Sequence, residues 1–209
     1  MESVLEKTQA VVLHNISWNS YKTIADNLQD ETPAHFTFDR GRLEIIVLSL
    51  KHENLKKLLA MLFERITENL EIEIFAAGST TFQREDLARG FEPDECYYVQ
   101  NAESMLGKAT VNLDFDPPPD LTIEVDLSHS SLNRMSIFAA IGIPEVWRYN
   151  ESELNMYVLR SGTYEISEKS QILPGIKSIE ITRLIEVGLK SGRKEFLKHI
   201  DEYTNHLSH

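Results

Sequence analysis

Residues Pro117 to Tyr149 read PPPDLTIEVDLSHSSLNRMSIFAAIGIPEVWRY, and this run predicts a strand, a helix and another strand in direct succession. In Leu121 to Leu127, apolar and polar residues alternate with the period of a strand. Ser130 to Ile141 has a helical pattern that stops at Gly142, and Pro144 to Tyr149 resumes a strand. The succession is typical of an α/β fold.

The alternation in the first of these strands separates an apolar face from a polar one. The polar face carries Thr122, Glu124 and Asp126. Glu124 and Asp126 point the same way with Cβ atoms about 7 Å apart, near enough to share one cation or a pair of cations. A mid-strand glutamate between apolar neighbours is costly to bury unless it is paired or bound to metal. Glu124 is therefore the leading candidate for a functional residue.

The elements before this strand complete a recognisable order. From His52 to Leu70, apolar residues recur at helical spacing and predict a long helix that packs on one face. Glu71 to Ala77 and Pro93 to Val99 then predict two strands. With the strand, helix and strand of residues 117–149, the order is αβββαβ, and we expect a mixed central sheet flanked by helices.

Further elements are expected at both ends of this core. Ser17 to Leu28 predicts a helix with Ser17 as N-cap, and Ala34 to Leu48 predicts a hairpin that turns at residues 39–42. A second hairpin turns at Ser161 and Gly162, and one or two helices follow from Ile179. We expect one domain over residues 1–209, with a core at about 42–175, an N-terminal extension at 1–41 and a C-terminal helical tail at 176–209.

Composition narrows the functional classes. The 209 residues are 42% hydrophobic, enough for one domain with a substantial core. The single cysteine, Cys96, cannot form an intrachain disulfide, and a reducing cytoplasmic location is expected. No stretch approaches the roughly 20 apolar residues of a spanning helix, so no membrane association is expected. The net charge of −12 disfavours a tight, non-catalytic nucleic-acid binder but suits a site that holds a divalent cation.

Two aspartates follow prolines at predicted strand starts, which by itself has a structural explanation because proline favours an extended entry. If the strands of Pro93 to Val99 and Leu121 to Leu127 pair antiparallel, Asp94 lies close to Glu124. Asp120 lies about 13 Å from Glu124 along its strand, so we expect it at the opposite edge and off the site.

The run GSTTFQREDLARGFEPDECYYVQN, from Gly78 to Asn101, together with Pro117 to Tyr149, resembles the Uma2 (DUF820) family. These proteins are abundant in cyanobacteria and are described as restriction endonuclease-like members of the PD-(D/E)XK nuclease superfamily. The resemblance spans roughly Ser17 to Pro174. It implies a restriction endonuclease-like fold with the order αβββαβ, which agrees with the order predicted from the residues.

The resemblance also implies roles for individual residues. Asp94 and Glu124 match the acidic pair that holds Mg2+ or Mn2+ in this superfamily, and the backbone carbonyl of Val125 is implied as a further ligand. An upstream acid or histidine often completes such a site, and the candidates are Glu44 and His52. His52 lies on the apolar stripe of its predicted helix and should face the core.

One position departs from the family pattern. The family lysine lies eight residues before the glycine that corresponds to Gly142, and Arg134 occupies that position here. The superfamily's more usual lysine position, two residues after Glu124, is Asp126. Arginine keeps its proton and cannot act as a general base, although it can position a water or stabilise a phosphorane.

These features support two hypotheses. The first is a Mg2+-dependent (or Mn2+-dependent) endonuclease that hydrolyses phosphodiester bonds in DNA, with Asp94 and Glu124 as ligands, Asp126 in support and Arg134 in place of the lysine. The alternative is a catalytically silent protein of the same fold that acts as an interaction or regulatory module. A carboxylate-pair glycosidase is disfavoured because Glu124 and Asp126 lie on one side instead of flanking a sugar. A homodimer is the general expectation for this size and fold.

Overall fold

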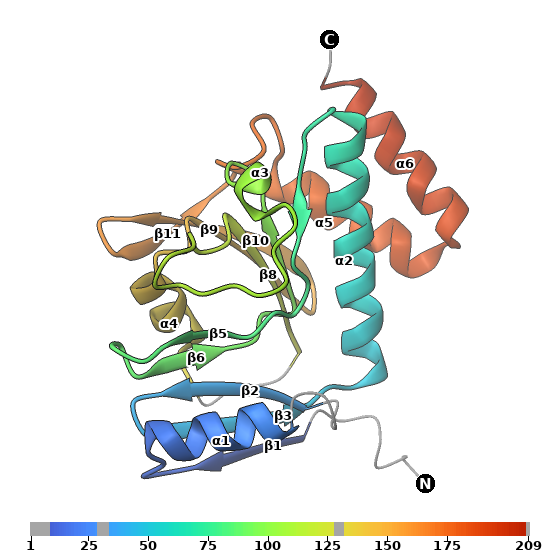
Figure 1. The fold of residues 1–209 in the computed structure, drawn as a ribbon. Helices are drawn as coiled ribbons and strands as arrows, with labels where there is room; N and C mark the ends of the chain where they lie inside the picture. The colour runs from blue at the N-terminus through green and yellow to red at the C-terminus, as the bar shows by residue number, and fades with distance from the viewer. Residues whose placement is uncertain (1–8, 29–33, 128–131, 208–209) are drawn as a thin grey trace, which may run out of the picture.

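A computed structural model describes residues 9–28, 34–127 and 132–207, and Figure 1 shows how they are arranged. The helices are α1 (Trp18–Leu28), α2 (Leu50–Asn69), α3 (Ala102–Met105), α4 (Arg134–Ile141), α5 (Ser178–Lys190) and α6 (Arg193–Asn205). The strands are β1 (Gln9–Leu13), β2 (Ala34–Asp39), β3 (Arg42–Val47), β4 (Phe75–Ala76), β5 (Phe82–Arg84), β6 (Arg89–Phe91), β7 (Glu95–Tyr98), β8 (Leu121–Asp126), β9 (Glu145–Asn150), β10 (Glu153–Arg160) and β11 (Thr163–Ser167).

The central sheet has the strand order β11-β10-β9-β8-β7-β4. β8 and β9 are parallel and are joined through α4, whereas the other neighbours in this sheet pair antiparallel. The predicted order αβββαβ is found as α2, β4, β7, β8, α4 and β9. The sheet is mixed, as expected, because the helical crossover allows β9 to run parallel to β8.

Helices cover this sheet on both faces (Figure 1). The apolar residues of β8 pack with α2, α5 and α6 in the largest core cluster. Leu121 and Ile123 of β8 belong to this cluster together with Leu59 and Phe63 of α2. The opposite face packs on α4 and on the β5–β6 hairpin, through Phe138 and the residues around it. No helix in the described residues is long and apolar enough to cross a lipid bilayer.

A second sheet, in the order β1-β3-β2-β6-β5, carries α1 and lies below the central sheet in the view of Figure 1. The predicted β2–β3 hairpin is confirmed, with a two-residue turn in which Arg40 and Gly41 have φ of 46° and 89°. Positive φ at both positions is the geometry of a tight hairpin turn. β2 and β3 pair in one sheet, although the expected boundary between extension and core, after residue 41, falls between them.

Two expectations about element bounds differ from the structure, and some strands were not predicted. The predicted strand at Glu71 to Ala77 was too long, because Glu71 has a φ of 55° as the chain leaves α2 and pairing with β7 begins only at Phe75. The helix predicted from Ser130 begins at Arg134, with Asn133 as N-cap, and Ser130 itself lies outside the described residues. The sequence patterns also missed β1 and the β5–β6 hairpin, whose strands are short.

Candidate functional site

The register between β7 and β8 places Asp94 beside Glu124. The two strands are antiparallel with Glu95 opposite Ile123, so the residue before Glu95 lies across from the residue after Ile123. Oδ2 of Asp94 accepts a hydrogen bond of 2.7 Å from the backbone N–H of Val125. Both carboxylates are buried, with 2% of Asp94 and 7% of Glu124 exposed. Two buried acids therefore meet where β7 begins and β8 ends.

Arg134 pairs with the second of these acids. Its Nη1 lies 3.0 Å from Oε2 of Glu124, and its Nη2 lies 3.4 Å from Oε1. Nη2 also donates to the backbone carbonyl of Glu92. Arg134 is the first residue of α4, and the N-cap Asn133 accepts a hydrogen bond from Ser136 N–H there. The start of α4 thus lies near the end of β8, and the guanidinium of Arg134 reaches Glu124 from there.

His52 contacts the first acid. It lies in the first turn of α2, after the N-cap Ser49, and its Nε2 is 3.2 Å from Oδ2 of Asp94. The imidazole is buried, with 4% exposed. The apolar stripe of the helix accounts for this orientation, because His52 shares the inward face with Leu55 and Leu59.

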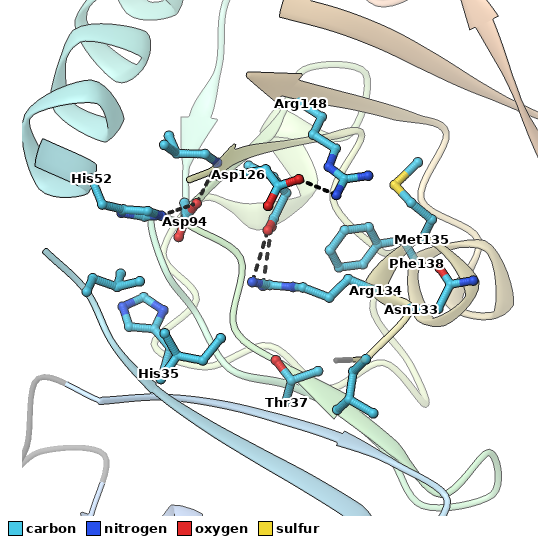
Figure 2. A pocket seen from close by; sticks show the side chains of 15 residues that line it. His35, Thr37, His52, Asp94, Asp126, Asn133, Arg134, Met135, Phe138 and Arg148 are labelled. Atoms are coloured by element: carbon cyan, nitrogen blue, oxygen red, sulfur yellow. Dashed lines mark hydrogen bonds and ion pairs between the residues drawn. The ribbon is translucent and has the colours of Figure 1, made fainter. Parts of the chain in front are cut away.

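These side chains line one cavity of about 120 Å3. Figure 2 shows Asp94 beside His52, and Arg134 and Arg148 reaching toward the end of β8 from different elements. Arg148 lies opposite Glu124 in the parallel ladder of β8 and β9, and it pairs with Asp126. The second sheet and the residue after β3 supply His35, Thr37, Ile46 and Leu48 to another part of the wall, and α4 supplies Met135 and Phe138.

Burial and pairing shift the pKa values of Asp94, Glu124 and His52. Burial opposes the charge on Asp94, but the hydrogen bond and charge of His52, the charge of Arg134 and the Val125 N–H hold its pKa below the usual value. Burial raises the pKa of Glu124 to about 8, because Arg134 offsets burial only in part and Asp94 adds repulsion. Burial opposes the charge on His52 as well, yet its bond to Asp94 raises its pKa.

Two other candidates from the sequence lie elsewhere. Asp120 accepts hydrogen bonds from the backbone N–H groups of Val99 and Asn101, and from the side chain of Asn101, at the opposite end of β8. Glu44 is buried in β3, opposite Thr37 of β2, and it is not among the residues that line the cavity. The cavity therefore groups Asp94, Glu124, Val125, Asp126, Arg134 and His52.

The sequence model of one protein family, described as "Putative restriction endonuclease", matches residues 18–195, which is most of the chain. The chain belongs to the Uma2 family. Comparison with curated proteins found no match.

A solved structure also resembles this Uma2 protein. It is described as "a putative nuclease belonging to DUF820" from Anabaena variabilis ATCC 29413. The two chains superimpose with a TM-score of 0.53 and 15% sequence identity, over 88% of this chain and 99% of that one. At this identity the likeness concerns the fold, and it confirms the restriction endonuclease-like architecture expected from the sequence.

Restriction endonuclease-like proteins generally use divalent metals, so the donor set has to be tested against one. Among the described residues, no three or more His, Cys, Asp or Glu side chains are grouped so that they could hold an ion. The cavity instead offers the two carboxylates of Asp94 and Glu124 beside the backbone of Val125. Mg2+ is usually held by one or two carboxylates together with water and substrate phosphate, so these oxygen donors fit such an ion.

Two ionisable residues of the cavity, Arg148 and His35, were not identified as candidates from the sequence. For Arg148 a signal was present, because period-2 alternation with Trp147 and Tyr149 turns it to the same side of the mixed sheet as Glu124. For His35 there was none. It belongs to a hairpin of the other sheet, and no local pattern relates it to Asp94.

Proposed function

We propose that this Uma2 protein is a divalent-metal-dependent endonuclease that hydrolyses phosphodiester bonds in DNA, with Mg2+ or Mn2+ as the cofactor. The observation that carries the proposal is the meeting of Asp94 and Glu124, from neighbouring antiparallel strands, in one cavity that also holds two arginines. Asp94, Glu124 and the carbonyl of Val125 would hold the ion. When bound, such an ion lowers the pKa of an attacking water and stabilises charge on the phosphate.

The chain's own residues prepare this site in distinct ways. His52 and the Val125 N–H keep Asp94 ionised and fix its orientation through contacts of 3.2 and 2.7 Å to one carboxylate oxygen. Arg134 offsets the charge of Glu124 and presents donors that could bind a phosphate oxygen. Arg148, with 40% of its side chain exposed, supplies a second guanidinium to the cavity, where Asp126 orients it.

DNA as the substrate agrees with the family and with this local arrangement of cations, although the chain as a whole carries a net charge of −12. Phosphate affinity depends on the cations close to the backbone, and a bound divalent ion would add to them. The homodimer and the cytoplasmic location stay predictions from the sequence.

A second candidate function has its own observation. In the catalytically silent alternative, Arg134 permanently neutralises Glu124. The bidentate contact between the two side chains, at 3.0 and 3.4 Å, is the ion pair that this alternative predicts. The same contact is expected if Arg134 takes the position of the family lysine in an active enzyme. The ion pair is therefore compatible with both functions, and the two differ in what a divalent cation does.

The deciding experiment measures metal binding and cleavage on the same protein. Isothermal titration with Mn2+ and incubation with supercoiled, linear and single-stranded DNA in Mg2+ or Mn2+ would be run on the wild type and on Glu124→Gln. We expect Mn2+ binding and DNA cleavage by the wild type, and the loss of both in the variant. A wild type that neither binds Mn2+ nor cleaves any of these substrates would instead establish the silent module.

A further inference from the structure

The proposed hydrolysis leaves one chemical need unassigned. An attacking water must give up a proton, and none of the acids and bases discussed so far is free to take it. An arginine side chain cannot act as a general base, which excludes Arg134. His52 uses Nε2 to contact Asp94, and that contact favours its protonated form. Asp126 is engaged by Arg148. The group that accepts the proton must lie elsewhere on the cavity wall.

His35 has the required properties. It lies on β2, in the second sheet, and lines the same cavity as Asp94 and Glu124. Its Nδ1 is buried and has no hydrogen-bond partner among the described residues. A buried ring nitrogen without a partner costs free energy, and a ligand or water that donates a hydrogen bond to it would remove that cost. Figure 2 shows His35 on the cavity wall formed by β2, across from the residues at the end of β8.

The position of His35 also offers a route by which an accepted proton can return to solvent. Besides the cavity of about 120 Å3, His35 lines a larger, open groove of about 810 Å3. The groove walls are mostly polar and include Thr80, Thr81, Gln83 and Asn112. A base that touches both the enclosed cavity and a wide polar groove can accept a proton on one side and return it to solvent on the other.

We propose that His35 is the general base of this chain, and that it takes over the proton transfer that an arginine at position 134 cannot perform. This inference rests on the proposed function. As the water oxygen bonds to phosphorus, its proton passes to Nδ1 of His35, and the bond from phosphorus to the leaving oxygen breaks. The leaving oxygen takes a proton from solvent, and His35 returns its proton through the groove. The products are a phosphomonoester and a free hydroxyl group.

The surroundings of His35 favour the neutral form that a base requires. Burial lowers its pKa below the usual value for histidine. Among the charged groups that face it, Lys56 of α2 and Arg134 of α4 lower the pKa further, whereas Asp94 and Glu53 raise it. A neutral imidazole accepts a proton, and a lowered pKa keeps it neutral over a wider range of pH.

The test compares wild type, His35→Gln and His35→Ala, with His206→Gln as a control at an exposed histidine. Rates of plasmid cleavage in Mg2+ would be measured across the pH range in which histidine titrates, beside Mn2+ affinity and thermal unfolding. We expect both His35 variants to lose about 100-fold in rate while Mn2+ affinity stays unchanged. In saturating Mg2+, which favours the ionised form of Glu124, the acidic limb of the pH profile should disappear in these variants. Added imidazole should partly restore His35→Ala. A purely structural role would not produce imidazole rescue.

The outcomes separate this inference from the proposed function. If the wild type cleaves DNA and His35→Gln cleaves it at the same rate with the same pH profile, His35 is not the base, while the nuclease function stands. If the wild type cleaves no DNA, both fall. Nitrogen NMR on the wild type gives an answer that is independent of how well the variants fold. Nδ1 of His35 should be unprotonated near neutral pH, and a proton found there would overturn the assignment.

Discussion

The backbone N–H of Val125 donates a hydrogen bond of 2.7 Å to the carboxylate of Asp94. This bond ties the residue before β7 to the end of β8 and fixes Asp94 next to Glu124. Because the same oxygen also meets His52, the position of Asp94 is set from a strand and from a helix at once.

Asp94→Asn and Asp120→Asn form a matched pair, since both aspartates follow a proline and accept backbone hydrogen bonds. Asp94→Asn should abolish Mn2+ binding because it removes a charged ligand. Asp120→Asn should leave Mn2+ affinity nearly unchanged and cost about 1–3 kcal/mol in stability, because it weakens the capping of Val99 and Asn101. Calorimetric titration and urea unfolding measure both quantities. A large loss of Mn2+ affinity in Asp120→Asn would show that the metal site involves the other end of β8.

Arg134→Lys tests the departure from the family pattern. We expect this variant to raise Mg2+-dependent cleavage, because an ammonium group can orient a water and release a proton more readily than a guanidinium. Plasmid nicking by both proteins at matched concentration measures the effect. If neither protein cleaves while both remain folded and bind Mn2+, the silent module becomes the better account.

Glu124→Gln should change how stability depends on pH. The pKa of Glu124 rises from 4.5 to about 8 on folding, so its ionisation destabilises the metal-free protein progressively as pH increases through that interval. The variant lacks this loss, and its stability relative to wild type should therefore increase between these two pH values. Added Mg2+ should reduce the difference by stabilising the ionised wild type. The prediction would be wrong if urea unfolding gave the same stability difference between variant and wild type at every pH.

His52→Gln should show the opposite pH dependence. The pKa of His52 is raised by its contact with Asp94, so the stabilisation is complete below the usual histidine pKa of 6.5 and is lost as pH rises through the folded value. The variant should be most destabilised in mildly acidic solution and approach wild type in alkaline solution. His206→Gln provides the control, because that side chain is exposed. Equal destabilisation at all pH values would mean that His52 acts through packing alone.

Gly90→Ala tests how tightly α1 packs on the second sheet. A Cβ at this position would clash with Oη of Tyr21 and lie 2.7 Å from its Cζ. Tyr21 is fully buried and stacks on Phe38 of β2 with a distance of 4.7 Å between ring centroids. Such overpacking should cost about 1–3 kcal/mol in the free energy of unfolding. Gly192→Ala is the comparison, because a Cβ there meets nothing within 4 Å, and its cost should be smaller. Equal effects of the two substitutions in urea unfolding would show that α1 moves aside at no cost.

Local pattern was sufficient for much of the fold. The alternation in β8 predicted which side chains face the core, and Leu121, Ile123 and Val125 do pack in the main cluster with α2. Gly142 ends α4 with a φ of 91°, as a glycine after a helix predicts. These features depend on residues a few positions apart, and the sequence displays them directly.

Short strands and long-range pairing were beyond such patterns. β5 and β6 have three residues each, too few for a period to show, and they exist because a neighbouring strand supplies hydrogen bonds. The candidate site shows the same division. The sequence by itself matched Asp94 and Glu124 to the acidic positions of the family pattern and placed Arg134 where the family has a lysine. Only the tertiary structure decided that His52 contacts Asp94, that Arg148 pairs with Asp126 and that His35 lines the cavity. The physical reason is that each of these depends on how separate elements pack, and packing joins residues that share no local period.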